Sequence, residues 1–199
     1  MALTARDVTA YGRLSYAHLF KPHAPNEQAD PKYSATLIIP KTDTTTIQRI
    51  QQAIQAAVTD GVERRILNQP IDPAHTKYPP LRDGDSMTDS GEQRGPEYAN
   101  RWFISAKANA TRKPFVVDGA MNPVIDEAEV YSGMWVNMAI QFYAYSNSGN
   151  KGITAALIGV QKVKDGPRLG GEALKAEDVF QALTPQQSQT PPATGGLGF

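Results

Sequence analysis

A two-residue alternation of apolar and polar side chains recurs along this sequence and limits the folds open to it. In residues 32–39, for example, Tyr33, Ala35 and Leu37 alternate with polar neighbours. This period is typical of β-strands that bury one face, whereas a helix repeats its apolar side chains every three or four residues. Patterns of this kind, together with strand-forming composition, predict strands at residues 8–20, 32–39, 101–109, 115–117, 130–145 and 151–163.

Helical spacing over a long segment occurs once, in the apolar side chains Ile47, Ile50, Ile54 and Val58. Asp43 or a neighbouring threonine can cap the first turn of this helix, and Asp60-Gly61 is expected to close it. Because no strand–helix–strand unit repeats, a parallel sheet is not expected. A small barrel of the oligonucleotide-binding (OB) type accommodates this set of elements. The predicted fold class is therefore mainly β, an OB-fold-like small barrel with one main helix.

Two segments lack any periodicity. Residues 61–100 contain five prolines and the stretch DGDSMTDSGEQRG, which predict a long loop excursion off the core with one short helix around residues 62–67. No residue from 179 to 199 is charged, and TPQQSQTPPATGG is of low complexity. We therefore expect an OB domain over residues 1–175 and a flexible, disordered C-terminal tail over residues 176–199.

The charge of the chain is balanced overall, with 20 Lys+Arg and 20 Asp+Glu, but it is unevenly distributed. Between Glu97 and Asp118 there are basic residues and no acidic ones, and residues 151–170 are also basic on balance. Residues 121–150 carry acids and no bases. The sequence thus predicts two basic strips separated by an acidic loop, which suits a polyanionic partner better than the net charge suggests.

Composition and motifs speak against catalysis. The absence of Cys removes disulfides, thiolate nucleophiles and cysteine-based metal sites. The three histidines have no second histidine at metal-ligand spacing, and no GxSxG, GxxxxGK[ST] or GxGxxG motif occurs. No apolar run approaches the roughly 18 residues of a membrane-spanning helix, and the N-terminus does not resemble a secretory signal. We expect a cytosolic protein that is no enzyme and needs no cofactor or metal.

Acidic residues leave one catalytic alternative open, a carboxylate-metal nuclease that would use Asp83, Asp85 or Asp126 with Glu127. Nucleases of the PD…(D/E)xK type place a lysine two residues after the second acid, and in the acidic run Asp126, Glu127 and Glu129 the residue two positions after Glu129 is Tyr131. The spacing therefore disfavours this alternative.

The strand at residues 101–109 carries aromatic and basic side chains on one face. Its alternation places Trp102 and Ile104 in the core, so Phe103, between Arg101 and Lys107, is expected on the exposed face. Proteins that bind single strands combine aromatic side chains, on which bases stack, with basic side chains that meet phosphates. This strand is therefore predicted to bind a nucleic acid.

The same reasoning applies to the strand at residues 130–145, whose outer face carries aromatics among amides, and to the polar face of the first strand. Adding the basic residues of the two strips completes the prediction. The candidate nucleic-acid-binding residues are Tyr11, Arg13, Arg101, Phe103, Lys107, Arg112, Lys113, Trp135, Tyr143 and Lys151.

An ordered series of blocks resembles one family of phage and prophage proteins. The blocks are GRLSYAHLFKP, KYSATLIIPKTD, YPPLRDGD, FISAKANATRKPFVVD and VYSGMWVNMAIQFYAYSNSGNKGITAALIGVQKVKDGPRLGG. This family, once a domain of unknown function, comprises phage single-stranded DNA-binding proteins with an OB fold. The resemblance covers about residues 1–175 and implies binding of single-stranded DNA in phage replication, recombination or repair, in the host bacterial cytoplasm, without enzymatic activity. It fixes no DNA-contacting positions.

The C-terminal tail departs from the pattern common among single-stranded DNA-binding proteins of bacteria and some phages, an acidic tail with a terminal aromatic. Phe199 supplies the aromatic, but the last acids are Glu172, Glu177 and Asp178. The terminal aromatic that this pattern shares with Phe199 leads us to expect that the tail docks phage or host replication proteins, although the acids lie further upstream than in the pattern. The alternative from another class is a structural phage protein, such as a tail or capsid accessory, whose barrel packs against other proteins.

Overall fold

The computed structural model describes residues 3–147 and 149–170, and these form a closed barrel. Its strands are β1 (Asp7–His23), β2 (Lys32–Pro40), β4 (Arg101–Asn109), β6 (Trp135–Asn147) and β7 (Asn150–Lys164). They pair in the order β4-β2-β1-β6-β7, each antiparallel to the next, and a short parallel pairing between β4 and β7 closes the ring. The mainly β, OB-fold-like prediction is confirmed.

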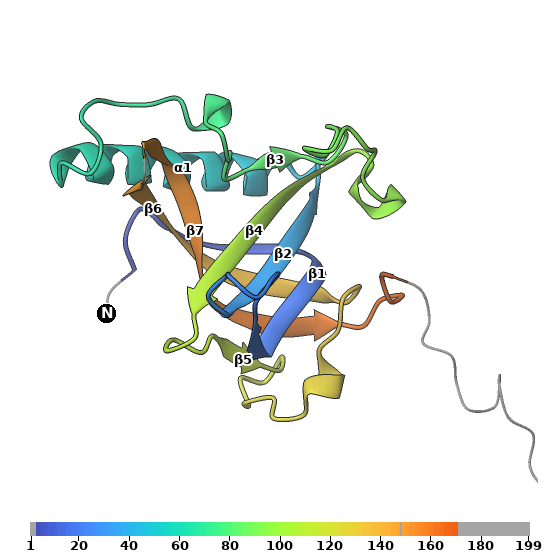
Figure 1. Cartoon of the computed structure of the whole chain (residues 1–199). Coiled ribbons are helices and arrows are strands. Elements are labelled where there is room, and N and C mark those ends of the chain that lie inside the picture. Colours follow the sequence, from blue (N-terminus) through green and yellow to red (C-terminus); the bar gives the residue numbers. More distant parts are fainter. Residues whose placement is uncertain (1–2, 148, 171–199) are drawn as a thin grey trace, which may run out of the picture.

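Two short strands extend the barrel. β3 (Arg82–Asp83) pairs with β4, and β5 (Phe115–Val117) pairs in parallel with β7. Figure 1 shows α1 (Thr44–Glu63) across one end of the barrel and β5 near the opposite end. No helix within residues 3–147 and 149–170 is both long and apolar enough to cross a membrane.

The core follows the predicted alternation. In β6 the even-numbered residues Val136, Met138, Ile140 and Phe142 are all fully buried. In β4 the even-numbered Ile104, Ala106 and Ala108 are buried as well. The strand phases read from the sequence therefore give the inner face of the barrel correctly.

The helix α1 begins as predicted and ends later. The Asp43 carboxylate accepts a hydrogen bond from the backbone N–H of Thr46 and caps the first turn. The helix continues past Asp60-Gly61 to Glu63, and the chain then folds back so that Leu67 is buried and its N–H donates to the Gly61 carbonyl. A separate short helix around residues 62–67 was the wrong expectation, because residues 62 and 63 belong to the last turn of α1.

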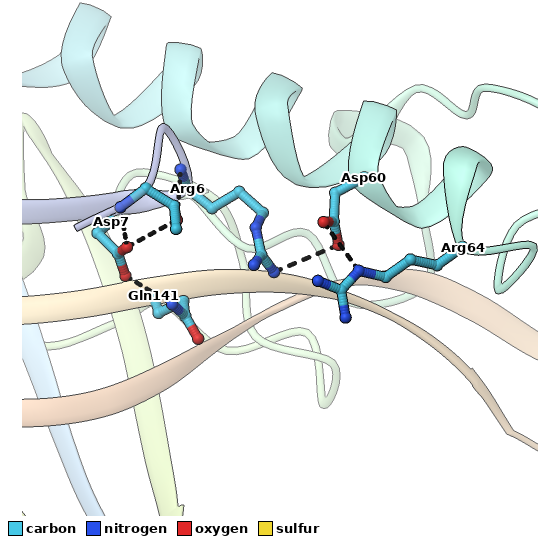
Figure 2. Close-up of polar contacts among 6 residues, drawn as sticks. Arg6, Asp7, Asp60, Arg64 and Gln141 are labelled. Atoms are coloured by element: carbon cyan, nitrogen blue, oxygen red, sulfur yellow. Dashed lines mark hydrogen bonds and ion pairs between the residues drawn. The ribbon is translucent and has the colours of Figure 1, made fainter. Parts of the chain in front are cut away.

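A polar cluster ties the start of β1 to α1 and β6, as Figure 2 shows. The Arg6 guanidinium lies 3.3 Å from the Asp60 carboxylate, which also accepts from Arg64 at 2.9 Å. The Asp7 carboxylate accepts from the Gln141 side chain at 2.8 Å. Burial alone would raise the pKa of Asp7, but its hydrogen bonds from Thr4 and Gln141 outweigh burial and hold that pKa below the usual value. These contacts fix the beginning of β1 against the barrel.

A bulge interrupts the phase of β1. Ser15 pairs with Thr36 and His18 with Ser34, so β1 has one more residue than β2 between these two pairs. Tyr16 lies in the bulge with a φ of 46° and is 67% exposed. The alternation predicts Tyr16 on the same face as Leu14, and this is wrong because the extra residue turns its side chain outward.

The second half of the 61–100 excursion returns to the barrel. The segment contains the 3-10 turns η1 (Pro73–His75) and η2 (Pro96–Tyr98), with β3 between them, and a third turn, η3 (Glu127–Glu129), precedes β6. Tyr98 is buried against Ile38 and Phe103 on the outer face of the sheet. The expectation that residues 61–100 lie off the core is therefore wrong for this part of the segment, as it is for Leu67 in the first half.

Candidate nucleic-acid interface

One row of mutually paired residues crosses the outer face of the barrel. From β7 to β3 the row consists of Lys164, Trp135, Arg13, Ile38, Phe103 and Arg82. Residues directly opposite each other on antiparallel strands project from the same face. At the usual spacing of about 4.8 Å between strands, the backbones of Trp135 and Arg82 are about 19 Å apart across the sheet. The row brings the predicted residues Arg13, Phe103 and Trp135 together.

Aromatic and basic side chains alternate at the Trp135 end of this row. The Trp135 ring is half-buried and stacks on Tyr11, with ring centroids 5.4 Å apart and an interplanar angle of 16°. The Lys164 ammonium lies 5.3 Å from the centre of the same ring. A stacked aromatic pair flanked by cations can accept a base on its open surface while the cations meet phosphates.

Backbone carbonyls hold Arg13 in place. Its Nε donates to the Gly133 carbonyl at 3.0 Å and its Nη2 to the Pro167 carbonyl at 2.7 Å. Gly133 has a φ of 116°, and a Cβ there would lie 2.0 Å from the Pro167 oxygen, so the close approach requires glycine. The guanidinium is thus oriented without a carboxylate to neutralise it among the described residues, which leaves its charge available to a ligand.

The segment after β7 repeats this pairing of cation and aromatic. The Arg168 guanidinium lies 4.1 Å from the centre of the Tyr131 ring. The Tyr131 hydroxyl donates to Asp165 at 3.1 Å, and hydrogen bonds from Lys162 and Tyr131 lower the pKa of the Asp165 carboxyl. Lys164, Arg168 and Tyr131 are missing from the predicted residues, although the basic strip at residues 151–170 was the signal that could have found the first two.

Phe103 lies on the predicted face but is not exposed. It is 3% exposed, because Tyr98 packs edge-on against its ring at 5.1 Å and the guanidiniums of Arg82 and Arg94 lie 4.5 and 4.7 Å from its centre. Residues 82–98, which sequence patterns place off the core, supply this cover. The predicted stacking of a base directly on the Phe103 ring is therefore wrong in this arrangement.

The other predicted basic residues of this region lie around the row. Arg101 is half-buried and pairs with Pro40 at the start of β4, whereas Lys107 is exposed further along that strand. Arg112 and Lys113 are exposed in the β4–β5 connection, and the Lys113 ammonium lies 5.7 Å from the Phe20 ring. These cations extend the basic surface but do not meet the aromatic pair.

Tyr143 and Lys151 lie at the far end of the β6–β7 hairpin. Tyr143 is 41% exposed, and Lys151 is exposed beside the turn. Eight residues of β6 separate Tyr143 from Trp135, or about 27 Å at 3.4 Å per residue. The structure therefore does not unite these two predicted residues with the Trp135 end of the row.

The acids of the nuclease alternative are used in other contacts. Asp83 and Asp85 both lie 2.6 Å from the Lys41 ammonium, and these hydrogen bonds raise the pKa of Lys41. Asp126 caps η3, and Glu127 pairs with Lys21. Within the part of the chain that the structure describes, no three histidine or acidic side chains gather as a metal site would require.

Comparison with known proteins identifies relatives. Residues 6–190 match the model of a family described as the ssDNA-binding protein of Enterobacter phage Enc34. Protein p50 of Acyrthosiphon pisum secondary endosymbiont phage 1 is 32% identical over 181 residues, which cover 86% of this chain and 90% of that protein.

Solved structures agree with this match. The single-stranded DNA-binding protein of bacteriophage Enc34, in complex with ssDNA, superposes with a TM-score of 0.67 at 28% identity, over 82% of this chain and 88% of that one. A single-stranded DNA-binding protein of bacteriophage T7 superposes with a TM-score of 0.54 at 17% identity, over 89% of this chain and 98% of that one, and so shows a shared fold.

Proposed function

We propose that this chain, which belongs to the phage family of the Enc34 ssDNA-binding protein, binds single-stranded DNA. The binding has little sequence preference and takes place on the outer face of the barrel. The family is defined by binding and not by a catalysed reaction, so the chain is not an enzyme. The observation that carries the proposal is the stacked Tyr11–Trp135 pair, with Lys164 over its ring and Arg13 beside it in the row.

The binding mode follows from the chemistry of this end of the row. Bases would stack on the open side of the aromatic pair, which tolerates any sequence because every base presents a π-face. Phosphates would meet Arg13, Lys164 and Arg168, whose positive charges form no ion pair within the described residues. The remaining predicted cations, which include Lys107, would extend the track for longer strands.

The test is quenching of tryptophan fluorescence by oligo-dT. The chain has two tryptophans, and Trp102 packs against the core on the inner side of β4. A Trp102→Phe variant therefore leaves Trp135 as the sole reporter of the proposed site. We expect quenching on binding and an affinity that falls with salt, with a slope of log K against log[salt] of roughly −3 for four or five phosphate contacts. Absence of binding at low salt would favour the structural accessory protein instead.

Replication, recombination or repair of phage DNA in the host cytoplasm is the biological role that we infer for this activity. The C-terminal tail at residues 176–199 lies outside the described residues, and we propose that it docks replication proteins. Deletion of residues 179–199 should then leave the affinity for oligo-dT unchanged and abolish capture of such partners. An unfolded truncated protein would contradict the proposed domain boundary.

A further inference from the structure

Two arginines lie against one ring without an ion-pair partner among the described residues. The guanidiniums of Arg82 and Arg94 both lie within 5 Å of the Phe103 ring centre, at 4.5 and 4.7 Å. Neither forms an ion pair with a carboxylate in residues 3–147 and 149–170. Burial and the neighbouring charge of Arg94 lower the pKa of Arg82, which Asp89 only partly offsets. The two positive charges repel each other, and an anion bound to both guanidiniums would offset that repulsion.

The hydrogen bonds of this pair are incomplete. Arg82 donates from Nη2 to the Ser105 hydroxyl at 2.9 Å, which fixes its position on the outer face. Arg94 donates to the Met87 carbonyl over a long 3.4 Å, and its buried Nε has no acceptor. A buried guanidinium N–H without an acceptor is a feature that calls for an explanation, and a bound oxyanion supplies one.

Tyr16 is an exposed aromatic near Tyr98, the residue that also packs on Phe103. Its neighbour Ser15 accepts a hydrogen bond from the Tyr98 hydroxyl at 3.4 Å, and Tyr98 packs on Phe103. The positive φ of Tyr16 is uncommon for a side chain of this size, and the bulge uses it to project the ring into solvent. Backbone strain that exposes an aromatic is a reason to ask what the ring binds.

We propose that Tyr16, Arg82 and Arg94 form a second contact for the bound DNA strand, in which a base stacks on Tyr16 and a backbone phosphate lies on the two guanidiniums. This inference rests on the proposed function. Arg82 on β3 is the last residue of the cross-strand row that also contains Trp135 on β6. A strand that engages both sites therefore crosses β1, β2 and β4 instead of following one strand of the barrel.

The salt dependence of oligo-dT binding tests the arginine pair. Arg94→Gln removes one phosphate contact, so the slope should become shallower by about 0.7 and the affinity at 0.1 M salt should fall about fivefold. Arg94→Lys keeps the charge and should keep the wild-type slope. If Arg94 serves only to cover Phe103, both variants should be less stable than the wild type and both should keep its slope. Lys77→Gln, which removes an exposed charge near η1, is the matched control and should bind as the wild type.

The outcomes separate the two proposals. Failure of the wild type to bind oligo-dT overturns both the proposed function and this inference. Binding by the wild type with an unchanged slope for Arg94→Gln overturns this inference alone. Competition between inorganic phosphate and oligo-dT at constant ionic strength tests whether the arginine pair is instead a site for a free anion. If phosphate competes with oligo-dT but Arg94→Gln binds oligo-dT as the wild type does, this inference is also overturned.

Tyr16 offers an independent test because glycine, which has no Cβ, relieves the strain of the positive φ at this position. Tyr16→Gly should melt at the same temperature as the wild type or higher, and yet bind oligo-dT roughly five- to a hundredfold more weakly for the loss of one stacked base. Tyr16→Phe keeps the ring and should bind normally. Wild-type affinity in Tyr16→Gly would show that no base stacks there.

Discussion

Trp135 and Phe103 occupy the same cross-strand row on the outer face, separated by Arg13 and Ile38. Both rings have cations over them, Lys164 in one case and two arginines in the other. Trp135 keeps part of its surface exposed, because its ring is only half-buried. At Phe103 the chain between β3 and β4 folds over the sheet and buries the ring.

The difference shows that the face of a strand and the exposure of that face are separate properties. A ring on an outer face can serve a ligand only if no other part of the chain covers it. Where the chain covers it, the aromatic becomes part of a small second core, here formed with Ile38 and Tyr98. The covering segment then presents its own side chains, Arg82 and Arg94, in place of the ring.

The largest expected effect concerns the covered end. Phe103→Ala should lower the free energy of unfolding by about 3–5 kcal/mol, because it removes a buried aromatic side chain. Urea denaturation measures this loss. Phe115→Ala is the matched control, since Phe115 is 72% exposed on β5 and its truncation should cost less than about 0.5 kcal/mol. Equal losses in the two variants would mean that residues 82–98 do not cover Phe103 in solution.

A smaller effect, on binding, is expected at the open end. Trp135→Ala should weaken binding of a labelled oligo-dT by about 1–3 kcal/mol, the usual worth of one stacked base. The variant Tyr143→Ala, at the distant end of β6, should lose less, because no described cation lies over that ring. A larger loss for Tyr143→Ala would move the principal stacking site to the β6–β7 hairpin.

The smallest expected effect is a pH dependence of stability near Trp135, where the Asp165 carboxylate accepts a hydrogen bond from the Tyr131 hydroxyl. The pKa of Asp165 lies below its usual value of 3.8 because Lys162 and Tyr131 donate hydrogen bonds to the carboxylate. Its contribution to stability is therefore fully present above about pH 3.8 and is lost as the pH falls through the lower folded-state value.

Thermal melting between pH 3 and pH 7 checks this expectation. Asp165→Asn should melt slightly below the wild type at neutral pH, and the difference should shrink as the solution is acidified. If the difference in melting temperature grows with acidification, the ionised Asp165 carboxylate does not stabilise the fold.

The sequence by itself determined the barrel and its inner face. Alternation depends only on the pleat of a strand, so it identified the buried residues of β4 and β6, and the spacing of Ile47, Ile50 and Ile54 identified α1 with its cap at Asp43. The same alternation placed aromatic and basic side chains on the outer face, and Trp135 and Arg13 are cross-strand partners there.

The tertiary structure alone decided which of those side chains remain open. Tyr16 left its predicted face because a bulge inserts one residue, and pairing with β2 determines that bulge. Phe103 became buried because residues 82–98, which have no periodicity of their own, bind to the sheet through β3 and Tyr98. Contacts between segments far apart in sequence leave no local pattern, so the sequence does not predict that Arg82 and Arg94 lie against Phe103.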